Sequence, residues 1–395
     1  MKRVVNLVGG GLLVLASLIL SLAACEVSLR IFFPDLYFDA FTATNDVDST
    51  KIWAPPVNTT NYFRHPDTGE KIPLVRNNLG IRLAYDILAE KLATSRNVAF
   101  FGDSFTANIR LPSQHSFPEV LRVLLDETAG THEVLNFGVD GYGPGQSFLR
   151  YRELDPAIRR NLQDVYFVFY INDLSDIVSD GIAYLDADGQ LKLKPGLPFF
   201  PSWLRGLTRL HITYFFVDAY SYLKGARGRV GEAAKNAGTE TMILAPDARR
   251  MPFATASTTG DARLDGSIGL LNALLLQWQT EVEAAGGVFH VVVIPRPDHH
   301  FMLAQFDRRL RILDLFPPFS RMLPGFDYAK IKFHNDGHWD ELGNLLAAVA
   351  LYQDLSAQGS APRLTASEIH AVLEKYYKNN GKWQPQDLGS LQFAY

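Results

Sequence analysis

One serine in this sequence stands where it could act as a nucleophile. The apolar run at residues 98–101 is too short for a buried helix and predicts a strand covered on both faces. It ends in Gly102-Asp103-Ser104, and a helical pattern follows at residues 117–127. Ligands of open α/β sheets bind at the carboxyl ends of the strands. Ser104 could therefore attack a carbonyl there while its own N–H faces the oxyanion, although Gly-Asp-Ser is also common in ordinary turns.

Two more loops offer hydrogen-bond donors. Residues 133–137 predict a second strand, and the glycines at positions 138, 141, 143 and 145 that follow it allow a backbone N–H to approach a ligand closely. Their spacing fits neither of the glycine-rich nucleotide-binding patterns, which argues against a nucleotide. Residues 165–171 predict a central strand that ends at Asn172-Asp173. The Asn172 amide offers two donors, although Asn-Asp also commonly terminates a strand.

Asp336 and His338 supply an acid and a base. They lie two residues apart in a predicted loop, after a short predicted strand at residues 331–333 and before a helix that begins near Asp340. If Nε2 of His338 is to accept a proton, its Nδ1–H needs an acceptor, and Asp336 can lie beside the ring. We expect the rival acid, Asp340, to serve the first turn of the helix, where negative charge is favourable.

The other candidate ligands in the sequence do not suggest a metal site. His290 lies within an apolar strand and is predicted to be a core histidine. His299 and His300, in a predicted loop, lack carboxylate partners at the spacing of a metal site. The single cysteine, Cys25, excludes an intrachain disulfide and a cysteine-based metal cluster. The net charge of −4 without a basic stripe argues against binding to nucleic acid.

A sheet has to bring the candidate residues together. The chain reads as strand, helix, strand, connection, strand, a long insertion at residues 180–262, helix, strand, strand and helix. This order predicts an α/β fold with a three-layer, doubly wound parallel sheet. Four loops then converge on the carboxyl edge of the sheet, and they carry Ser104, Gly141, Asn172 and the pair Asp336 and His338.

The insertion differs in character from the rest of the chain. It opens with a hairpin pattern that turns at Asp188-Gly189 and continues with aromatic-rich segments. We interpret it either as a lid or membrane-facing flap beside the site, or as ordinary packing against the sheet. A helix is predicted after it, from an N-cap at Ser267 to residue 285.

The chain divides into four segments. We expect a membrane anchor or signal segment at residues 1–30, a loop-rich lead-in at residues 31–94, the α/β domain at residues 95–355, and a C-terminal helix and tail at residues 356–395. Within the lead-in, residues 78–87 predict an early edge strand or a turn that packs near the site.

The N-terminus is apolar enough to enter a membrane. Residues 4–25 carry no charge and are long enough to span a bilayer, and the basic residues before them favour an N-terminus inside and a body outside. The motif LAAC, which ends at Cys25, instead resembles a lipobox whose cysteine is lipidated. A cleaved secretory signal is a third interpretation. The apolar residues after Cys25 favour an uncleaved anchor, and each interpretation places the body outside the cytoplasm.

Residues 95–350 resemble the SGNH (GDSL-like) hydrolase superfamily, whose fold is flavodoxin-like. The segments GDSFT, NFGVDG, YIND and DGHW match the four sequence blocks of that superfamily in order. The resemblance implies that Ser104 is the nucleophile, His338 the base and Asp336 the acid that orients the base. It also implies an oxyanion hole made of the N–H groups of Ser104 and Gly141 and the side-chain amide of Asn172.

Two positions depart from the pattern of the superfamily. Many members carry the aspartate three residues before the histidine, where this chain has Asn335. The motif Asp-x-His-Trp is instead similar to the branch that includes alginate O-acetylation enzymes of the bacterial periplasm. Ile171 stands where a glycine is common, which could narrow the approach to Asn172.

The resemblance implies an extracytoplasmic serine esterase that acts through an acyl-enzyme on O-acyl esters of a glycan or lipid, with no metal or organic cofactor. An O-acetyltransferase that modifies an exported polysaccharide would use the same residues. A scaffold in an envelope complex, without turnover, is the non-enzymatic alternative. The presence of Ser104, Asn172 and His338 speaks against it.

Overall fold

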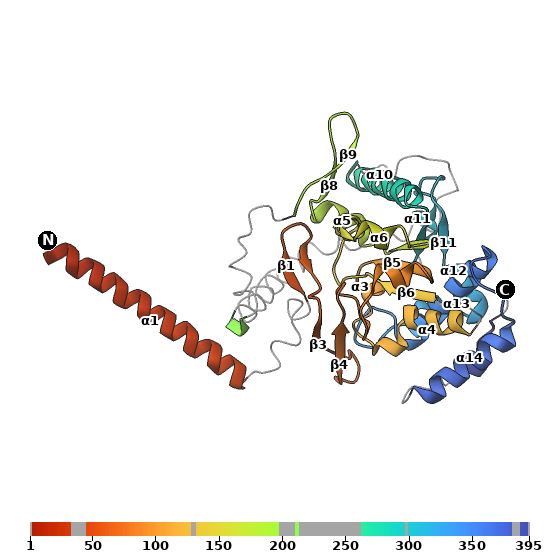
Figure 1. Cartoon of the computed structure of the whole chain (residues 1–395), viewed down its shortest axis with the longest axis horizontal. Coiled ribbons are helices and arrows are strands. Elements are labelled where there is room, and N and C mark those ends of the chain that lie inside the picture. Colours follow the sequence, from red (N-terminus) through yellow and green to blue (C-terminus); the bar gives the residue numbers. More distant parts are fainter. Residues whose placement is uncertain are drawn as a thin grey trace, which may run out of the picture. The chain divides into compact units, whose positions relative to one another are not determined.

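The computed structural model describes residues 2–32, 45–127, 132–196, 210–212, 262–296, 299–380 and 388–393 (Figure 1). The chain divides into two compact units, Met1–Val47 with Phe199–Ala245, and Asp48–Pro198 with Pro246–Tyr395. In the first unit, helix α1 (Lys2–Phe32) runs without a break through Cys25. Glu26 of this helix accepts hydrogen bonds from the N–H groups of His211 and Ile212 at 3.1 and 2.9 Å.

The rest of the described chain contains both strands and helices. The strands are β1 (Asp46–Asp48), β2 (Ile52–Ala54), β3 (Thr59–Arg64), β4 (Lys71–Arg76), β5 (Arg96–Gly102), β6 (His132–Asn136), β7 (Asp164–Phe169), β8 (Ala183–Leu185), β9 (Leu191–Leu193), β10 (Val288–Val293) and β11 (Ile312–Asp314). The α-helices are α2 (Ala89–Leu92), α3 (Ser104–Ala107), α4 (Phe117–Asp126), α5 (Pro144–Glu153), α6 (Pro156–Arg159), α7 (Asp173–Ser179), α10 (Ala262–Ala284), α11 (His299–Leu303), α12 (Phe316–Met322), α13 (Glu341–Ala357) and α14 (Ala366–Asn379). Short 3₁₀ turns are η3 (Ser113–His115), η6 (Tyr328–Lys330) and η7 (Leu388–Ser390).

Five parallel strands form the central sheet, in the order β11-β10-β7-β5-β6. Counted along the chain from the other edge, this order is 2-1-3-4-5, which is that of flavodoxin-like doubly wound folds. The predicted α/β class with a parallel, doubly wound sheet is therefore confirmed. The carboxyl ends of all five strands meet at one edge of the sheet, so loops from distant parts of the sequence meet there too.

Both faces of the sheet are covered, which explains its continuously apolar strands. In β5, Val98 and Phe100 point into one hydrophobic cluster, and Ala99 and Phe101 point into the other. Helices α4, α12, α13 and α14 contribute side chains to the first cluster, and α5, α7 and α10 contribute to the second. The three predicted layers are therefore present.

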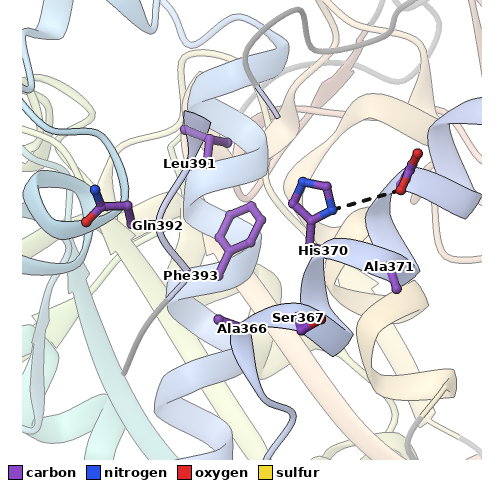
Figure 2. A pocket seen from close by; sticks show the side chains of 8 residues that line it. Ala366, Ser367, His370, Ala371, Leu391, Gln392 and Phe393 are labelled. Atoms are coloured by element: carbon purple, nitrogen blue, oxygen red, sulfur yellow. Dashed lines mark ion pairs between the residues drawn. The ribbon is translucent and has the colours of Figure 1, made fainter. Parts of the chain in front are cut away.

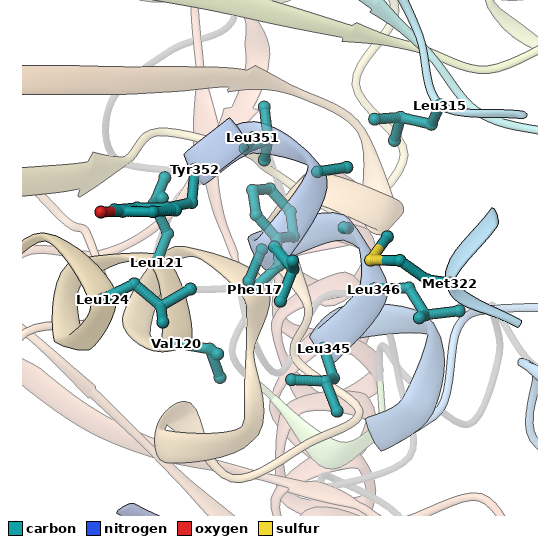
Figure 3. Close-up of a cluster of buried hydrophobic side chains, with 14 of the residues drawn as sticks. Phe117, Val120, Leu121, Leu124, Leu315, Met322, Leu345, Leu346, Leu351 and Tyr352 are labelled. Carbon is teal, nitrogen blue, oxygen red and sulfur yellow. The ribbon is translucent and has the colours of Figure 1, made fainter. Parts of the chain in front are cut away.

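Aliphatic and aromatic side chains join α4 to α13 (Figure 3). Phe117 and Leu121 of α4 and Leu345 and Leu346 of α13 are fully buried in one cluster. Burying one such side chain contributes on the order of 2 kcal/mol. This packing fixes the amino end of α13, and that end follows directly on the loop that carries His338.

The fifth strand lies elsewhere than the sequence predicts. Residues 331–333 are not a strand: they follow η6, and Lys332 forms an isolated bridge with Trp339. The last strand of the sheet along the chain is β11, which pairs with the outer side of β10. It has three residues and is too short to show a periodic pattern in the sequence. Asp336 and His338 therefore reach the sheet edge from a loop that follows no strand of the sheet.

Helix boundaries differ from the prediction at two points. Helix α10 begins at Ala262, so Ser267 lies inside it and is not its N-cap. His299 and His300 begin α11 and do not lie in a loop. The helix predicted near Asp340 is confirmed, since Asp340 is the N-cap of α13 and accepts a hydrogen bond from Gly343 N at 3.0 Å.

The described part of the lead-in combines loops with short strands and one short helix. Residues 45–94 hold four strands and α2, and β3 pairs with β4 as an antiparallel hairpin. Residues of β4 alternate between exposed and buried, which is the period of a strand with one covered face. The turn signal Asp67-Thr68-Gly69 between them marks this hairpin in the sequence. Residues 78–87 form a turn and no edge strand.

The insertion opens as predicted, with the antiparallel hairpin of β8 and β9. The lid or flap expected within residues 180–262 falls largely on residues 197–209 and 213–261, which lie outside the described residues.

Candidate active site

Ser104 is the first residue of α3, directly after β5. The chain can turn here because Gly102 has a φ of 151°, and a Cβ at this position would lie 2.8 Å from the carbonyl oxygen of Val168. Asp103 is the N-cap of α3 and accepts a hydrogen bond from Phe105 N at 3.0 Å. The turn thus presents the Ser104 hydroxyl at the carboxyl edge of the sheet, half-buried.

Consecutive hydrogen bonds connect Ser104 to His338 and His338 to Asp336. Nε2 of His338 lies 2.6 Å from Oγ of Ser104. The other ring nitrogen, Nδ1, contacts Oδ1 of Asp336, which also accepts a hydrogen bond from the backbone N of His338 at 2.8 Å. With a proton on Nδ1 the lone pair of Nε2 faces the serine hydroxyl, which is the arrangement of a nucleophile, a base and an orienting acid.

Aromatic rings support the imidazole of His338. The ring of Phe105 lies 4.8 Å from it, centroid to centroid, and Trp339 packs edge-on against Phe105 at 5.4 Å. Trp339 is only 1% exposed, so the tryptophan of the Asp-x-His-Trp motif is a core residue. Its burial anchors the residue that follows His338 and so limits how far the imidazole can move.

The loop before His338 is held by the β3–β4 hairpin. The carboxylate of Asp67 accepts hydrogen bonds from the backbone N–H groups of His334 and Asn335, at 2.9 and 2.8 Å. His65 packs edge-on against Phe333 with 5.1 Å between ring centroids. The hydroxyl of Tyr328 donates to the carbonyl of Gly337 at 3.1 Å. The lead-in hairpin is therefore part of the wall of the candidate site.

The charge of Asp336 is stabilised by Arg110. Nε of Arg110 donates to Oδ2 of Asp336 at 3.0 Å, and its Nη1 donates to Asp140 at 2.7 Å. Burial alone raises the pKa of Asp336, but the hydrogen bond with His338 and the charge of Arg110 outweigh it, so that the pKa lies well below its usual range. Asp336 is thus ionised throughout the neutral range, as an orienting acid must be.

Two backbone N–H groups at the site are available to a ligand. Within the described residues, the N–H groups of Ser104 and Gly141 donate to no other protein group. Gly141 is exposed and has a φ of 74°. The loop that carries it packs closely against α3, since a Cβ at Gly138 would lie 2.6 Å from the backbone N of Ala107. These are the two backbone donors that the sequence predicts for an oxyanion hole.

The amide of Asn172 is bonded to carboxylates in this structure. Its Nδ2 donates to Asp176 at 2.8 Å and to Asp103 at 3.3 Å, and its Oδ1 is buried without a hydrogen-bond partner among the described residues. The longer bond to Asp103 is the weaker one. Ile171 packs against the hydrophobic cluster of α5, α7 and α10.

The acids around Asn172 have raised pKa values. Burial raises the pKa of Asp103 to about 6, although the N–H of Phe105 and the charge of His338 lower it. Burial and the neighbouring Asp103 raise the pKa of Asp173 well above its usual range. Burial leaves the pKa values of these carboxyl groups raised, unlike that of Asp336, because they have no cation bonded to them in the described part of the chain.

Arg110 and Asp67 are not among the site residues that the sequence predicts. No local pattern marks either residue, because the groups they hold lie far along the chain. In the described residues we find no cluster of three or more His, Cys, Asp or Glu side chains that could hold a metal ion. His290 is buried, as predicted, and stacks on Tyr166 at 4.5 Å.

A cavity of about 590 Å³ lies between α14 and the C-terminal segment (Figure 2). Its wall includes Ala366, His370, Leu391 and Phe393, and none of its lining residues belongs to the candidate site. His370 and Glu374 form an ion pair at 4.0 Å beside it.

One helix of the described chain is long and apolar enough to cross a membrane. The most apolar 18-residue window within Gly9–Phe32 has a mean hydropathy of 2.3, and none of this window is buried in the structure. Length and composition of this kind fit a membrane anchor or a signal sequence. The predicted membrane segment at the N-terminus is supported to this extent.

Comparison with known proteins shows a distant similarity to a solved structure. No family model and no curated protein matches the sequence. Among solved structures, the chain is similar to one described as belonging to the lipolytic proteins of the G-D-S-L family, from Desulfitobacterium hafniense DCB-2. The match covers 65% of this chain and 98% of that chain, with 12% sequence identity and a TM-score of 0.32. The assignment of the fold class accordingly rests on the strand order and the covering helices of this chain itself.

Proposed function

We propose that the chain is an extracytoplasmic serine esterase that acts through an acyl-enzyme on O-acyl esters of a glycan or lipid. The observation that carries the proposal is the hydrogen-bonded series of Ser104, His338 and Asp336, with 2.6 Å between the serine Oγ and the imidazole Nε2. These side chains come from two loops far apart in the sequence, and both loops lie at the ligand-binding edge of a parallel sheet.

The proposed reaction begins with proton transfer from the Ser104 hydroxyl to Nε2 of His338 while Oγ attacks the ester carbonyl. Asp336 accepts the Nδ1 proton of His338 in a hydrogen bond and stabilises the imidazolium that forms. The imidazolium then protonates the leaving alcohol, and an acyl-Ser104 ester remains. A water molecule that loses its proton to His338 attacks this ester, and the carboxylic acid leaves with Ser104 restored.

The oxyanion of the tetrahedral intermediate would be stabilised by the free N–H groups of Ser104 and Gly141. The third donor would be the Nδ2 hydrogen of Asn172 that bonds to Asp103, with the oxyanion replacing Asp103 as its acceptor. The 3.3 Å bond to Asp103 is the weaker of the two bonds of this nitrogen, and the 2.8 Å bond to Asp176 can persist and orient the amide.

Covalent labelling tests the proposal. Wild-type protein should react with a fluorophosphonate probe and hydrolyse p-nitrophenyl esters, and a series of acyl chain lengths would define the acyl group. Ser104→Ala should abolish both reactions without loss of the fold. Ser356→Ala serves as the matched control, because Ser356 lies near the carboxyl end of α13 and its hydroxyl donates to the carbonyl of Pro362. Full labelling of Ser104→Ala would show that another residue is the nucleophile.

An O-acetyltransferase is a second candidate, because Asp336-x-His338-Trp339 resembles the alginate O-acetylation branch. The acyl-enzyme is the same, and a sugar hydroxyl takes the place of water as the group that attacks it. The two activities are separated by supplying an acetyl-ester donor with an oligosaccharide. Acetylated oligosaccharide would indicate a transferase, and free acetate alone would indicate an esterase.

We also propose that α1 is an uncleaved anchor that holds the body outside the cytoplasm. Its support is the length and apolarity of Gly9–Phe32 and the continuity of the helix through Cys25. Cys25→Ala should then remain in the membrane fraction at otherwise unchanged mass. Release of this variant, with loss of an acyl mass that the wild type carries, would identify a lipoprotein instead. Protease accessibility of the body in intact cells tests the orientation.

A further inference from the structure

We propose that Arg110 is a positioning residue that holds the carboxylate of Asp336 in its working orientation and ties it to the loop of Gly141. This inference rests on the proposed function and extends it to a residue outside the four sequence blocks. Arg110 lies between α3 and η3, and its side chain is 13% exposed. It donates from Nε to Asp336 at 3.0 Å and from Nη1 to Asp140 at 2.7 Å.

Arg110 completes the bonding of the Asp336 carboxylate. Oδ1 of Asp336 is used by His338, through its backbone N at 2.8 Å and its ring Nδ1. Oδ2 is used by Arg110. With each oxygen bonded to a different group, rotation of the carboxylate about χ2 breaks at least one charge-assisted hydrogen bond. Without Arg110, Oδ2 would have no bonded partner among the described residues, and the carboxylate would be free to turn away from Nδ1.

The second bond of Arg110 reaches the loop of the oxyanion hole. Asp140 directly precedes Gly141, whose N–H is one of the free donors of the site. One guanidinium therefore connects the acid that orients His338 with the loop that would stabilise the oxyanion. A planar group with several fixed donors can do this, whereas an ammonium group on a flexible stem positions two partners less well.

Arg110 is itself held in place. Arg82 donates from Nη2 to the carbonyl of Leu111 at 2.7 Å and also bonds the carbonyl of Asn108, so the backbone on both sides of Arg110 is fixed. The ring of Phe63, from β3, lies 5.5 Å from the guanidinium carbon. The arginine is therefore a rigid part of the site wall.

Binding of an anionic substrate group by Arg110 is the main alternative. Two carboxylates already face its single positive charge, and the side chain is mostly buried. An added anion would meet a net negative charge. The same two carboxylates keep the pKa of Arg110 above its usual value despite the opposing effect of burial. Positioning of Asp336 is thus the role that fits the charges.

The test compares kcat and KM of the full-length wild type, Arg110→Gln and Arg110→Lys with p-nitrophenyl acetate. We expect Arg110→Gln to lower kcat about 10- to 100-fold, with KM changed less than about twofold. Loss of a residue that orients an active-site ligand from outside typically has an effect of this size. Arg110→Lys should recover part of kcat, because one ammonium can reach one carboxylate. Arg122→Gln is the matched control: Arg122 also bridges two acids, Glu119 and Asp126, but on α4 away from the site.

A double variant separates positioning from a general loss of structure. In an Asp336→Asn background, Arg110→Gln should lower kcat less than about threefold, since its target is already impaired. An undiminished loss in that background, a rise in KM at unchanged kcat, or wild-type kcat in Arg110→Gln would each overturn the inference. If Arg110→Gln does not fold, Arg110→Lys and Asp140→Asn decide: both should lower kcat, and wild-type kcat in both overturns the inference.

Ser104→Ala is measured in parallel. Activity that depends on Ser104 but not on Arg110 overturns this inference alone. Activity that does not depend on Ser104 overturns the proposed function and, with it, this role of Arg110.

Discussion

The two edges of the central sheet carry similar side chains and differ in the groups that accompany those side chains. Near the amino edge, the buried Asp164 pairs with Arg96 at 3.0 Å and lies 3.8 Å from Nε2 of His290. Tyr166, stacked on that histidine, donates to Asp354 at 3.1 Å. At the carboxyl edge, an aspartate, an arginine and a histidine again lie together. A half-buried serine accompanies them, with two N–H groups that donate to no other described residue.

The difference shows what distinguishes a structural histidine from a candidate base. His290 is 4% exposed and lies between a carboxylate and an aromatic ring, and no hydroxyl group of the described residues forms a hydrogen bond with it. His338 is about one-quarter exposed and faces a serine. Nε2 of His290 is buried without a hydrogen-bond partner among the described residues. What sets His338 apart is therefore the serine beside it, together with the donors and the space that a substrate needs.

The largest expected effect separates the two histidines. His338→Gln should lower esterase turnover by at least about 10³-fold, because no other group in the site can take the serine proton. His290→Gln should change turnover per folded molecule less than about threefold. Steady-state kinetics with p-nitrophenyl acetate measures both. A similar loss in the two variants would remove the distinction between the edges.

The next largest expected effect is the difference in turnover between Asp336→Asn and Asp340→Asn. Asp336→Asn should lower turnover by about 10²- to 10⁴-fold, since the amide cannot accept the Nδ1 proton in the same way. Asp340→Asn should cost little activity, because Asp340 caps α13 and asparagine is also a good N-cap. Kinetics of the two variants at pH 7.5 decides, and the reverse order would transfer the acid's role to Asp340.

At the amino edge the expected effect is on stability. Asp164→Asn removes the ion-pair partner of Arg96, at a position that is 1% exposed. We expect a loss of about 1–2 kcal/mol in the free energy of unfolding, with unchanged turnover per folded molecule. Urea unfolding in detergent measures the first quantity and active-site titration the second. Loss of turnover without loss of stability would connect this edge to the chemistry.

The smallest expected effect concerns Asp103 and pH. Its folded-state pKa of about 6 lies above the usual value of 3.8, mainly because of burial. The folded state then binds more protons than the unfolded state between these values, so this contribution to stability is complete below pH 4 and is lost as the pH rises through 6. Asp103→Asn should reduce this dependence by on the order of 1 kcal/mol.

The control for this prediction is Asp155→Asn, which changes an exposed N-cap, that of α6, in the same way. Urea midpoints at pH 4.5 and 7.5 provide the comparison. An Asp103→Asn protein with the pH dependence of the wild type would mean that other buried acids, such as Asp173, account for it.

Much of the fold followed from local pattern. Apolar runs such as residues 98–101 and 165–171 predicted strands buried on both faces, and a parallel sheet requires such strands because helices cover both sides. The start of α13 near Asp340 was also predicted, since the start of a helix depends on residues within one turn. The three-residue β11 and the β3–β4 hairpin were not predicted. The first is too short for a periodic signal, and the second lies in a stretch rich in Asn, Asp, Thr and Pro, a composition that favours loops.

The sequence by itself determined which residues could perform acyl transfer, because Ser104, Asn172, Asp336 and His338 are recognisable by type and short-range spacing. Only the tertiary structure decided how they are held. Arg110 and Asp67 act on the loop of His338 from far away in the sequence, and Asn172 turned out to be bonded to Asp103 and Asp176. Such contacts depend on how distant segments pack against one another, and no local pattern records that packing.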